Sequence, residues 1–290
     1  MTTRRDFLTA TSAAVLTAAQ TVQAGAEKKA ETRRRFQLGT VTYNIAANWD
    51  LATLLKVCKA VGLAAVELRT THKHGVEPSL SPKARAEVRN QFADSGAVIW
   101  GLGTVCEFHA TDPNVVQQNI ETCKQFLQLS ADLGAKGVKV RPNGLPKDVP
   151  VEKTLEQIGK ALVPCGQAAA NLGQEVWVEV HGGGTSHPPH LKTIMGHCGL
   201  PNVGITWNSN STDVKDGSMK AYFDLLRPWI KSCHINELYS GYPWRELFRC
   251  LQDAGYDRYT MIEISPGMPD VPSGERLLRY YKALWNELSA

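Results

Sequence analysis

The amino-acid sequence predicts a single α/β domain with the (β/α)8 TIM barrel fold, and three observations lead to this fold class. From Phe36 onward, short runs of β-branched residues alternate with longer amphipathic stretches. Eight such runs occur, and most are apolar throughout, as parallel strands are when helices cover them. The chain of 290 residues is also long enough for one such barrel, which takes about 250 residues.

The predicted strands follow one another in chain order, and each is separated from the next by room for a helix. They cover the segments Phe36–Asn44, Ala65–Arg69, Val98–Gly103, Gly137–Arg141, Val176–His181, Val203–Asn208, Ile230–Asn236 and Tyr259–Ser265. The clearest predicted helices are Leu51–Val61, Pro82–Ser95, Val115–Leu133, Val151–Leu172 and Pro243–Ala254. Strands that alternate with helices in this way are typical of a parallel sheet.

Glycines mark the ends of the predicted helices, a few residues before the strands that follow. They are Gly62, Gly96, Gly134, Gly173 and Gly255. Glycine commonly ends a helix because it adopts the left-handed backbone conformation without a steric penalty. The dinucleotide-binding pattern G-x-G-x-x-G is absent after the first strand, so eight units favour a closed barrel over an open doubly wound sheet.

The first residues differ in character from the rest of the chain. Arg4-Arg5 precedes Phe7-Leu8 and an Ala- and Thr-rich stretch that is too short and too weakly apolar for a membrane span. The segment resembles a twin-arginine export signal. We therefore expect a signal peptide at 1–26, a linker at 27–35 and the barrel at 36–290. This implies a periplasmic or other extracytoplasmic location without membrane insertion after cleavage; the alternative is a frayed helix that begins with two arginines.

Cysteine content and charge exclude several classes of protein. The chain has seven cysteines, an odd number, and no C-x-x-C pair, so we expect neither a disulfide framework nor a zinc site built from thiolates. The net charge of +4 comes largely from Arg33-Arg34-Arg35 before the first strand, and the remaining charges are mixed. A nucleic-acid partner is therefore not expected. A homo-oligomer is compatible with the sequence.

Polar residues that can bind a metal ion end four consecutive predicted strands. They are Glu179, Asn208, His234 and Glu263. Reactive residues of TIM barrels stand at the carboxyl ends of the strands, and these four are about one strand–helix unit apart, so we expect them to be neighbours. Two carboxylates, an imidazole and an amide oxygen suit Mn²⁺ or Mg²⁺ and tolerate Co²⁺ or Zn²⁺.

Each of these residues also has a purely structural interpretation. Glu179 or Glu263 could pair with an arginine or lysine across the barrel, since a buried carboxylate needs a partner. His234 could be a hydrogen-bonded core histidine, and Asn208 could cap a turn. The common position of all four at strand ends favours the metal site.

The motifs around these residues resemble the xylose-isomerase-like TIM-barrel family. They are Glu179-Val180-His181, the strand ending at Asn208, Ser232-Cys233-His234-Ile235-Asn236 and Met261-Ile262-Glu263, and the resemblance covers about residues 36–288. The family includes sugar isomerases, sugar epimerases and inosose-processing enzymes, and it binds one metal through Glu, Asp, His and Glu. The resemblance implies ligand roles for Glu179, His234 and Glu263. It also implies substrate contacts for His181 and, after the third strand, His109.

One position departs from the family pattern. Asn208 stands where the family usually has Asp, which removes a negative charge and implies weaker binding of a more Lewis-acidic ion. Asn210 and Asp213 are alternative ligands just beyond the strand. The extra histidines of the family's abasic-site endonucleases are not evident.

The expected function is a divalent-metal-dependent isomerase or epimerase of a sugar or keto-sugar, which transfers a proton through a metal-bound enediolate. Glu179 and Glu263 would remove and return the proton, and His181 would bind the enediolate oxygen. The candidate substrate-binding residues are Glu67, His109, Lys139, Arg141, Trp49 and Trp244. The alternatives are a metal-dependent lyase or dehydratase acting on keto-glycosides or inososes, and a non-catalytic barrel that binds a carbohydrate or a partner protein.

Overall fold

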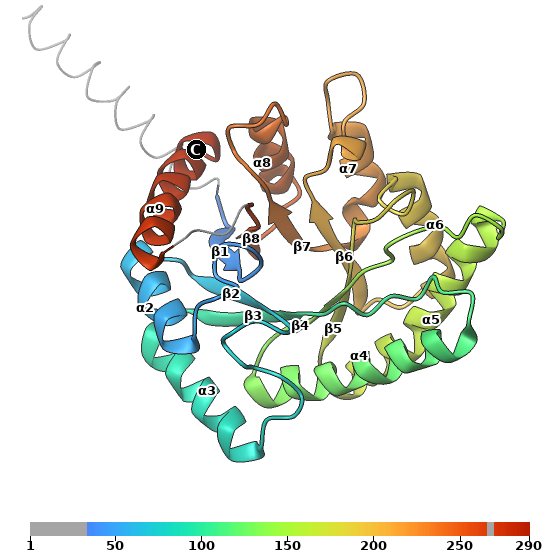
Figure 1. Cartoon of the computed structure of the whole chain (residues 1–290). Helices are drawn as coiled ribbons and strands as arrows, with labels where there is room; N and C mark the ends of the chain where they lie inside the picture. The colour runs from blue at the N-terminus through green and yellow to red at the C-terminus, as the bar shows by residue number, and fades with distance from the viewer. Residues whose placement is uncertain (1–33, 266–269) are drawn as a thin grey trace, which may run out of the picture.

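Eight parallel strands close into a barrel in chain order, which confirms the predicted fold class (Figure 1). The computed structural model describes residues 34–265 and 270–290. The barrel closes where β1 pairs with β8, with Gln37 opposite Tyr259 and Thr40 opposite Ile262. The strands are β1 (Gln37–Val41), β2 (Ala65–Arg69), β3 (Val98–Gly103), β4 (Gly137–Val140), β5 (Glu175–Glu179), β6 (Val203–Asn208), β7 (Ile230–Ile235) and β8 (Tyr259–Ile262).

Helices surround the strands and alternate with them along the chain (Figure 1). They are α2 (Leu51–Val61), α3 (Pro82–Ser95), α4 (Pro113–Leu133), α5 (Val151–Asn171), α6 (Pro188–Cys198), α7 (Lys220–Leu226), α8 (Trp244–Asp253) and α9 (Val271–Leu288). Two short 3₁₀ turns, η1 (Ser211–Asp213) and η2 (Arg227–Trp229), flank α7. Within the described residues, no helix is both long and apolar enough to cross a bilayer.

The predicted helix ends at glycine agree with the structure. All five glycines have a positive φ. Gly62, for example, has φ 73° and donates its N–H to the carbonyl of Cys58, which ends α2. The predicted signal peptide and almost all of the linker lie outside the described residues, and their assignment stays a prediction.

Several predicted strands extend beyond the observed ladder at their carboxyl ends. β4 ends at Val140, β5 at Glu179 and β8 at Ile262, whereas the sequence extended them to Arg141, His181 and Ser265. The residues just past these ends leave the ladder at the mouth of the barrel. Among them, Arg141, His181, Glu263 and Ser265 line the pocket described below, whereas Val180 and Ile264 are apolar and buried, which continues the strand pattern.

The interior of the barrel is packed below its mouth. Trp100 and Trp177 stack with ring centroids 4.8 Å apart, together with Val41, Ala65 and Met261. Gly101 of β3 makes room for this pair, because a Cβ there would lie 2.5 Å from the Trp177 ring. A larger apolar layer fills the space between the strands and the helices. The seven cysteines are free thiols, and six of them are buried.

Candidate metal and sugar site

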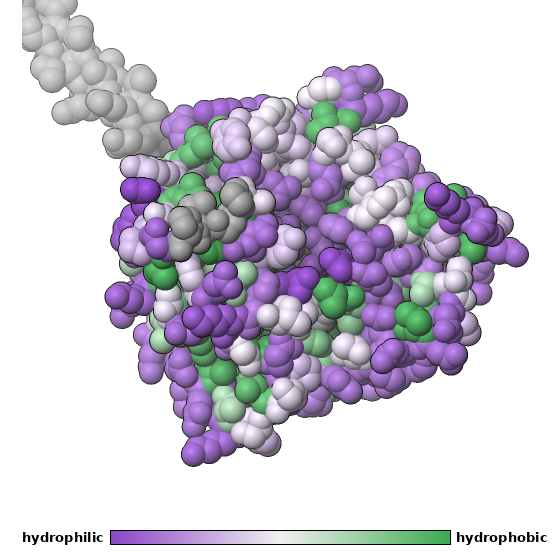
Figure 2. Space-filling view, viewed as in Figure 1, coloured by the Kyte–Doolittle hydropathy of each residue, from purple (hydrophilic) through white to green (hydrophobic). Residues whose placement is uncertain are grey.

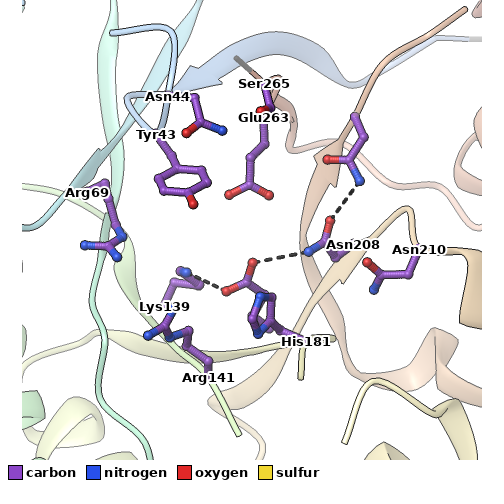
Figure 3. A pocket seen from close by; sticks show the side chains of 12 residues that line it. Tyr43, Asn44, Arg69, Lys139, Arg141, His181, Asn208, Asn210, Glu263 and Ser265 are labelled. Carbon is purple, nitrogen blue, oxygen red and sulfur yellow. Dashed lines mark hydrogen bonds and ion pairs between the residues drawn. The ribbon is translucent and has the colours of Figure 1, made fainter. Parts of the chain in front are cut away.

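The carboxyl ends of the strands surround one pocket of about 270 Å³ (Figure 3). In Figure 2, hydrophilic residues gather around the hollow near the centre of the face shown. The pocket is close to the lower end of the usual range for small-molecule sites, about 300–1,000 Å³, so it suits a ligand of one sugar unit. Its lining consists of Tyr43, Asn44, Arg69, Lys139, Arg141, Glu179, His181, Asn208, Asn210, Asn236, Glu263 and Ser265.

Three of the four predicted metal ligands come together at the floor of this pocket. One ligand atom each of Glu179, His234 and Glu263 lies within 4.8 Å of the other two. The His234 Nδ1 atom is 3.2 Å from Glu263 Oε2 and 3.7 Å from Glu179 Oε1. Glu179 and His234 are buried, while Glu263 is partly exposed to the pocket. Two carboxylates and an imidazole in this arrangement fit a single divalent ion.

His234 is held from below by a fully buried carboxylate. Glu67 Oε2 lies 3.0 Å from His234 Nε2, so Nδ1 is the ring nitrogen that faces the cluster. Burial opposes a charge on the ring, but Glu67 and Glu263 outweigh it and raise the pKa of His234 well above its ordinary value. The imidazole is therefore placed where a positive charge, whether a proton or a metal ion, is favoured.

The position of Glu67 differs from the one expected for a substrate contact. It does not line the pocket, because it precedes the end of β2 by two residues and therefore points inward one layer below the rim. Gly103 of β3 leaves space for it, since a Cβ there would lie 2.8 Å from Glu67 Oε1. Glu67 thus supports His234 and does not face a ligand.

Lys139 lines the pocket and pairs with Glu179. Its Nζ atom is 2.5 Å from Glu179 Oε2, and both side chains are almost fully buried. Burial favours the neutral form of Lys139, but Glu179, Glu67 and Glu263 outweigh it and raise its pKa. Burial likewise opposes a charge on Glu179, but Lys139 and His234 hold the pKa of Glu179 far below its ordinary value. Both groups are therefore charged at neutral pH.

Asn208 braces the cluster through its amide group. Its Nδ2 atom donates to Glu179 Oε1 over 3.2 Å, and its Oδ1 atom accepts from Asn236 Nδ2 at 3.4 Å. In this orientation its oxygen faces Asn236, so a ligand role for Asn208 stays a prediction.

The two alternative ligands beyond β6 are engaged elsewhere. Asn210 lines the pocket, and its Nδ2 atom donates to the carbonyl of Val180 over 2.6 Å. Asp213 is buried in η1, where its carboxylate accepts the backbone N–H of Asn210 over 2.8 Å. Burial raises the pKa of Asp213 well above its ordinary value, which favours the neutral carboxyl over the ionised form that a metal ligand needs.

Two of the remaining predicted contacts line the pocket, and one does not. His181 lines it with a buried Nδ1 that has no partner among the described residues. Arg141 lines it and donates from Nη2 to Glu107 Oε1 over 2.7 Å. His109 lies 4.0 Å from the other oxygen of Glu107 and faces a neighbouring cavity beside Gly144.

The tryptophans expected as walls of the sugar site are instead packed in the core. Trp49 and Trp244 are 5% and 4% exposed, and neither lines the pocket. Trp244 begins α8 and packs against Tyr242 and Phe248. The aromatic residue that does line the pocket is Tyr43, just after β1, and 41% of its surface is exposed.

The sequence reasoning also missed polar residues of the rim. Arg69 is the last residue of β2 and Asn236 the first after β7, so the strand-end rule that identified Glu179 applies to both. Asn44 and Ser265 end the predicted first and eighth strands, but the structure places both in the loops that follow β1 and β8.

Three solved structures, those of two sugar epimerases and of a protein with a bound zinc atom, are similar in fold. A 3-keto-D-glucoside 4-epimerase from E. coli gives a TM-score of 0.71 at 15% identity, over 85% of this chain and 98% of that one. A D-psicose 3-epimerase gives 0.74 at 14% identity, over 88% and 99%. The IOLI protein with a zinc atom gives 0.70 at 15% identity, over 88% and 98%. No curated protein matches the sequence.

At these identities the structures show the fold, and the family follows from the sequence itself. The family model described as xylose isomerase-like TIM barrel matches residues 55–282. The match begins within α2, ends within α9 and includes every residue of the metal-ligand cluster. The chain therefore belongs to the xylose isomerase-like TIM barrel family.

Proposed function

We propose that this protein is a divalent-metal-dependent isomerase or epimerase of a sugar or keto-sugar. The observation that carries the proposal is the convergence of Glu179, His234 and Glu263 on the floor of a pocket of about 270 Å³. Two of the similar structures are those of sugar epimerases, which supports the same reaction class. The 3-keto-D-glucoside 4-epimerase favours keto-glycosides as one group of substrates to test.

Glu179, His234 and Glu263 would hold the ion, with Asn208 as a fourth ligand if its amide turns. When bound, the ion acts as a Lewis acid that makes the C–H beside a carbonyl more acidic. The oxygen-rich ligand set favours Mn²⁺, and Mg²⁺, Co²⁺ and Zn²⁺ are the alternatives. The zinc atom in the IOLI protein supports a divalent ion in this type of barrel.

The two carboxylates supply the proton transfer. Glu179 ends β5 and Glu263 follows β8, so they reach a ligand from different sides of the closed barrel. The ammonium of Lys139 keeps Glu179 ionised and able to accept a proton. The imidazole of His181 lines the pocket and can hydrogen-bond an oxygen on which negative charge develops.

Export by the twin-arginine route is part of the same proposal. It rests on Arg4-Arg5 and the stretch after them, which lie outside the described residues. An extracytoplasmic enzyme would meet sugars scavenged from the surroundings.

The test compares the wild type with Glu263→Gln. We expect about one divalent ion per chain in the wild type by elemental analysis, and a loss of at least tenfold in affinity in the variant. Solvent deuterium should enter one carbon of a ketose or 3-keto-glycoside, and the variant should lower this rate by about 10²–10⁴-fold.

The matched control is Glu287→Gln, which removes an exposed carboxylate on α9. It should change neither metal content nor exchange. A wild type without bound divalent ion and without exchange on the whole panel would contradict the proposal. Product analysis by NMR separates epimerisation from elimination, the lyase alternative.

A further inference from the structure

The cationic residues of the pocket lie on one side of it. Figure 3 shows Arg69, Lys139 and Arg141 together on one side, across from Glu263 and Asn208. The cations come from the ends of β2 and β4, and β3 between them ends in Gly103, which contributes no side chain. A ligand in this pocket therefore meets a cationic wall along one side.

Two of the three cations are neutralised within the protein, and Arg69 is not. Lys139 pairs with Glu179 and Arg141 with Glu107. Arg69 forms no ion pair with any residue in 34–265 or 270–290, and its Nη1 atom donates only to the carbonyl of Thr70 over 3.0 Å. It is half-buried, and burial together with the nearby Arg141 lowers its pKa. A partly desolvated cation without a counter-charge is costly unless a ligand provides one.

The backbone of Arg69 is fixed on both sides. Its N–H donates to Thr42 Oγ1 over 2.9 Å, and its carbonyl accepts from His74 Nε2 at 2.9 Å. The Nδ1 atom of His74 accepts the N–H of Val76 over 3.1 Å, so Nε2 is the protonated nitrogen that donates. The end of β2 therefore presents the arginine in one direction.

The loop after Arg69 is strained and held by a carboxylate. Thr71 has φ 67°, an unusual value for a β-branched residue. Glu77 maintains this turn, because it accepts from the hydroxyl of Thr70 and from the backbone N–H of Thr71. The turn fixes the position of the Thr70 carbonyl, which accepts a hydrogen bond from the guanidinium of Arg69. Local strain that orients a single unpaired arginine towards a pocket is typical of a ligand contact.

A carboxylate is the anion that this arrangement fits best. The planar guanidinium binds a carboxylate through two parallel hydrogen bonds, and one negative charge balances the one unpaired cation. The neighbouring Arg141 lines the same pocket, and its buried Nε–H has no partner among the described residues. A phosphate is larger and carries more charge, and the pocket of about 270 Å³ already has the size of a single sugar unit.

We propose that the substrate is a sugar acid, and that Arg69, with Arg141 beside it, binds its carboxylate. This rests on the proposed function, because it specifies the substrate class of the same pocket. The class comprises keto-aldonates and keto-uronates, whose carboxylate would lie against β2 and β4 while the reacting carbon faces Glu179 and Glu263.

The experiment measures binding by calorimetry with Mn²⁺ present and without turnover. The probes are D-glucuronate, D-gluconate, D-glucose and D-glucose 6-phosphate, and the proteins are the wild type, Arg69→Gln and Arg69→Lys. We expect the two sugar acids to bind at least tenfold more tightly than glucose. Arg69→Gln should remove this advantage, while Arg69→Lys, which keeps the charge but not the planar fork, should retain part of it.

Arg245→Gln on α8 is the matched control, because Arg245 is exposed and pairs with Glu287. It should bind like the wild type, and circular dichroism and metal content confirm that each variant is folded. Three results would each overturn the proposal. They are equal affinities for glucose and glucuronate, an affinity for the sugar acids that is unchanged in Arg69→Gln, and binding of glucose 6-phosphate alone.

Deuterium exchange on matched neutral and acidic keto-sugars separates this proposal from the proposed function. Exchange in neutral substrates only would refute the sugar acid and leave the isomerase. Binding of sugar acids through Arg69 without exchange in any substrate would refute the isomerase and leave the carboxylate site.

Discussion

At the scale of single residues, His234 owes its orientation to Glu67. The hydrogen bond at Nε2 leaves Nδ1 for the cluster, and a carboxylate behind a ligating histidine also makes it a stronger ligand. Because Glu67 is fully buried and does not line the pocket, it supports the cluster through its hydrogen bond to the histidine and not as a ligand.

We expect Glu67→Gln to weaken the binding of Mn²⁺ by about 10–100-fold, since the neutral amide holds the ring without polarising it. Calorimetric titration of the metal-free protein measures this. Glu107→Gln is the control: it removes a carboxylate near the pocket that contacts Arg141 and not His234, so the affinity should stay within about twofold. Equal losses in both variants would refute a specific role for Glu67.

How far the sequence predicts single residues depends on which side of the barrel they face. Glu179 and Glu263 are visible because a carboxylate in an apolar strand needs a partner. The prediction for Trp49 and Trp244 was wrong because an aromatic residue near the mouth of the barrel can pack either against a ligand or into the core, and the residue type is the same in both cases. Arg69 ends a strand as the ligands do, but its lack of a partner is visible only in three dimensions.

At the scale of elements, α5 and α6 are packed unusually closely at one glycine. A Cβ at Gly159 of α5 would lie 2.6 Å from the carbonyl oxygen of Ile194 in α6. Gly196, on the exposed side of α6, has no atom within 4 Å of such a Cβ. A methyl group is therefore expected to disturb the packing of the two helices at Gly159 and to leave it unchanged at Gly196.

We expect Gly159→Ala to lower the free energy of unfolding by about 1–3 kcal/mol, because backbone must move to admit the methyl group. Gly196→Ala should raise it by up to about 1 kcal/mol, because alanine favours the helix. Urea-induced unfolding measures both. A Gly159→Ala variant that is as stable as the wild type, or more stable, would contradict the close approach of α6 to α5 at Gly159.

The elements that the sequence identified least well have physical features in common. α6 begins at Pro188-Pro189, which obscures a helical pattern, and α7 has only seven residues. By contrast, α2 and α3 were predicted at their observed bounds, because Gly62 and Gly96 end them and Asp50 and Ser81 cap them.

At the scale of the whole molecule, the two ends of the barrel have separate roles. The pocket lies at the carboxyl ends of the strands, while Glu175 begins β5 at the opposite end. Glu175 accepts from Arg258, just before β8, at 2.7 and 3.0 Å, and from Trp177 Nε1 at 2.8 Å. This network joins distant strands of the barrel below the stacked tryptophans.

We expect Glu175→Gln to lower the free energy of unfolding by about 3 kcal/mol at pH 7, because it leaves Arg258 without its counter-charge. Burial favours protonation of Glu175. The hydrogen bonds from Arg258 and Trp177, together with the positive charge of Arg258, outweigh burial and lower the pKa of Glu175. In the unfolded chain the pKa of a glutamate is about 4.3, and in the folded protein the pKa of Glu175 is lower. The ionised carboxylate therefore stabilises the folded protein above about pH 4.3, and this stabilisation is lost as the pH falls through the folded-state pKa.

The difference in stability between wild type and Glu175→Gln should therefore shrink below about pH 4. Thermal unfolding from pH 3 to pH 8 measures it, and metal affinity at the other end of the barrel should be unchanged. A difference that is constant with pH would contradict the charged pair.

The closed barrel itself was predictable because its signal is repeated. Each of the eight runs of β-branched residues, and each of the five helix-ending glycines, is weak evidence for one strand–helix unit. Eight such units together favour a closed parallel barrel over other topologies. The site combines residues from strands that are far apart in sequence, such as Glu67 and His234, and no local pattern relates them.

The buried ammonium of Lys139 affects how the protein is assembled. Three carboxylates, those of Glu67, Glu179 and Glu263, surround it, so part of their mutual repulsion is cancelled by a group the chain carries itself. Folding therefore does not have to wait for an inorganic cation, in contrast to zinc fingers, whose apo forms are unfolded. For the metal-dependent enzyme proposed above, the polypeptide can fold first and take up the ion afterwards.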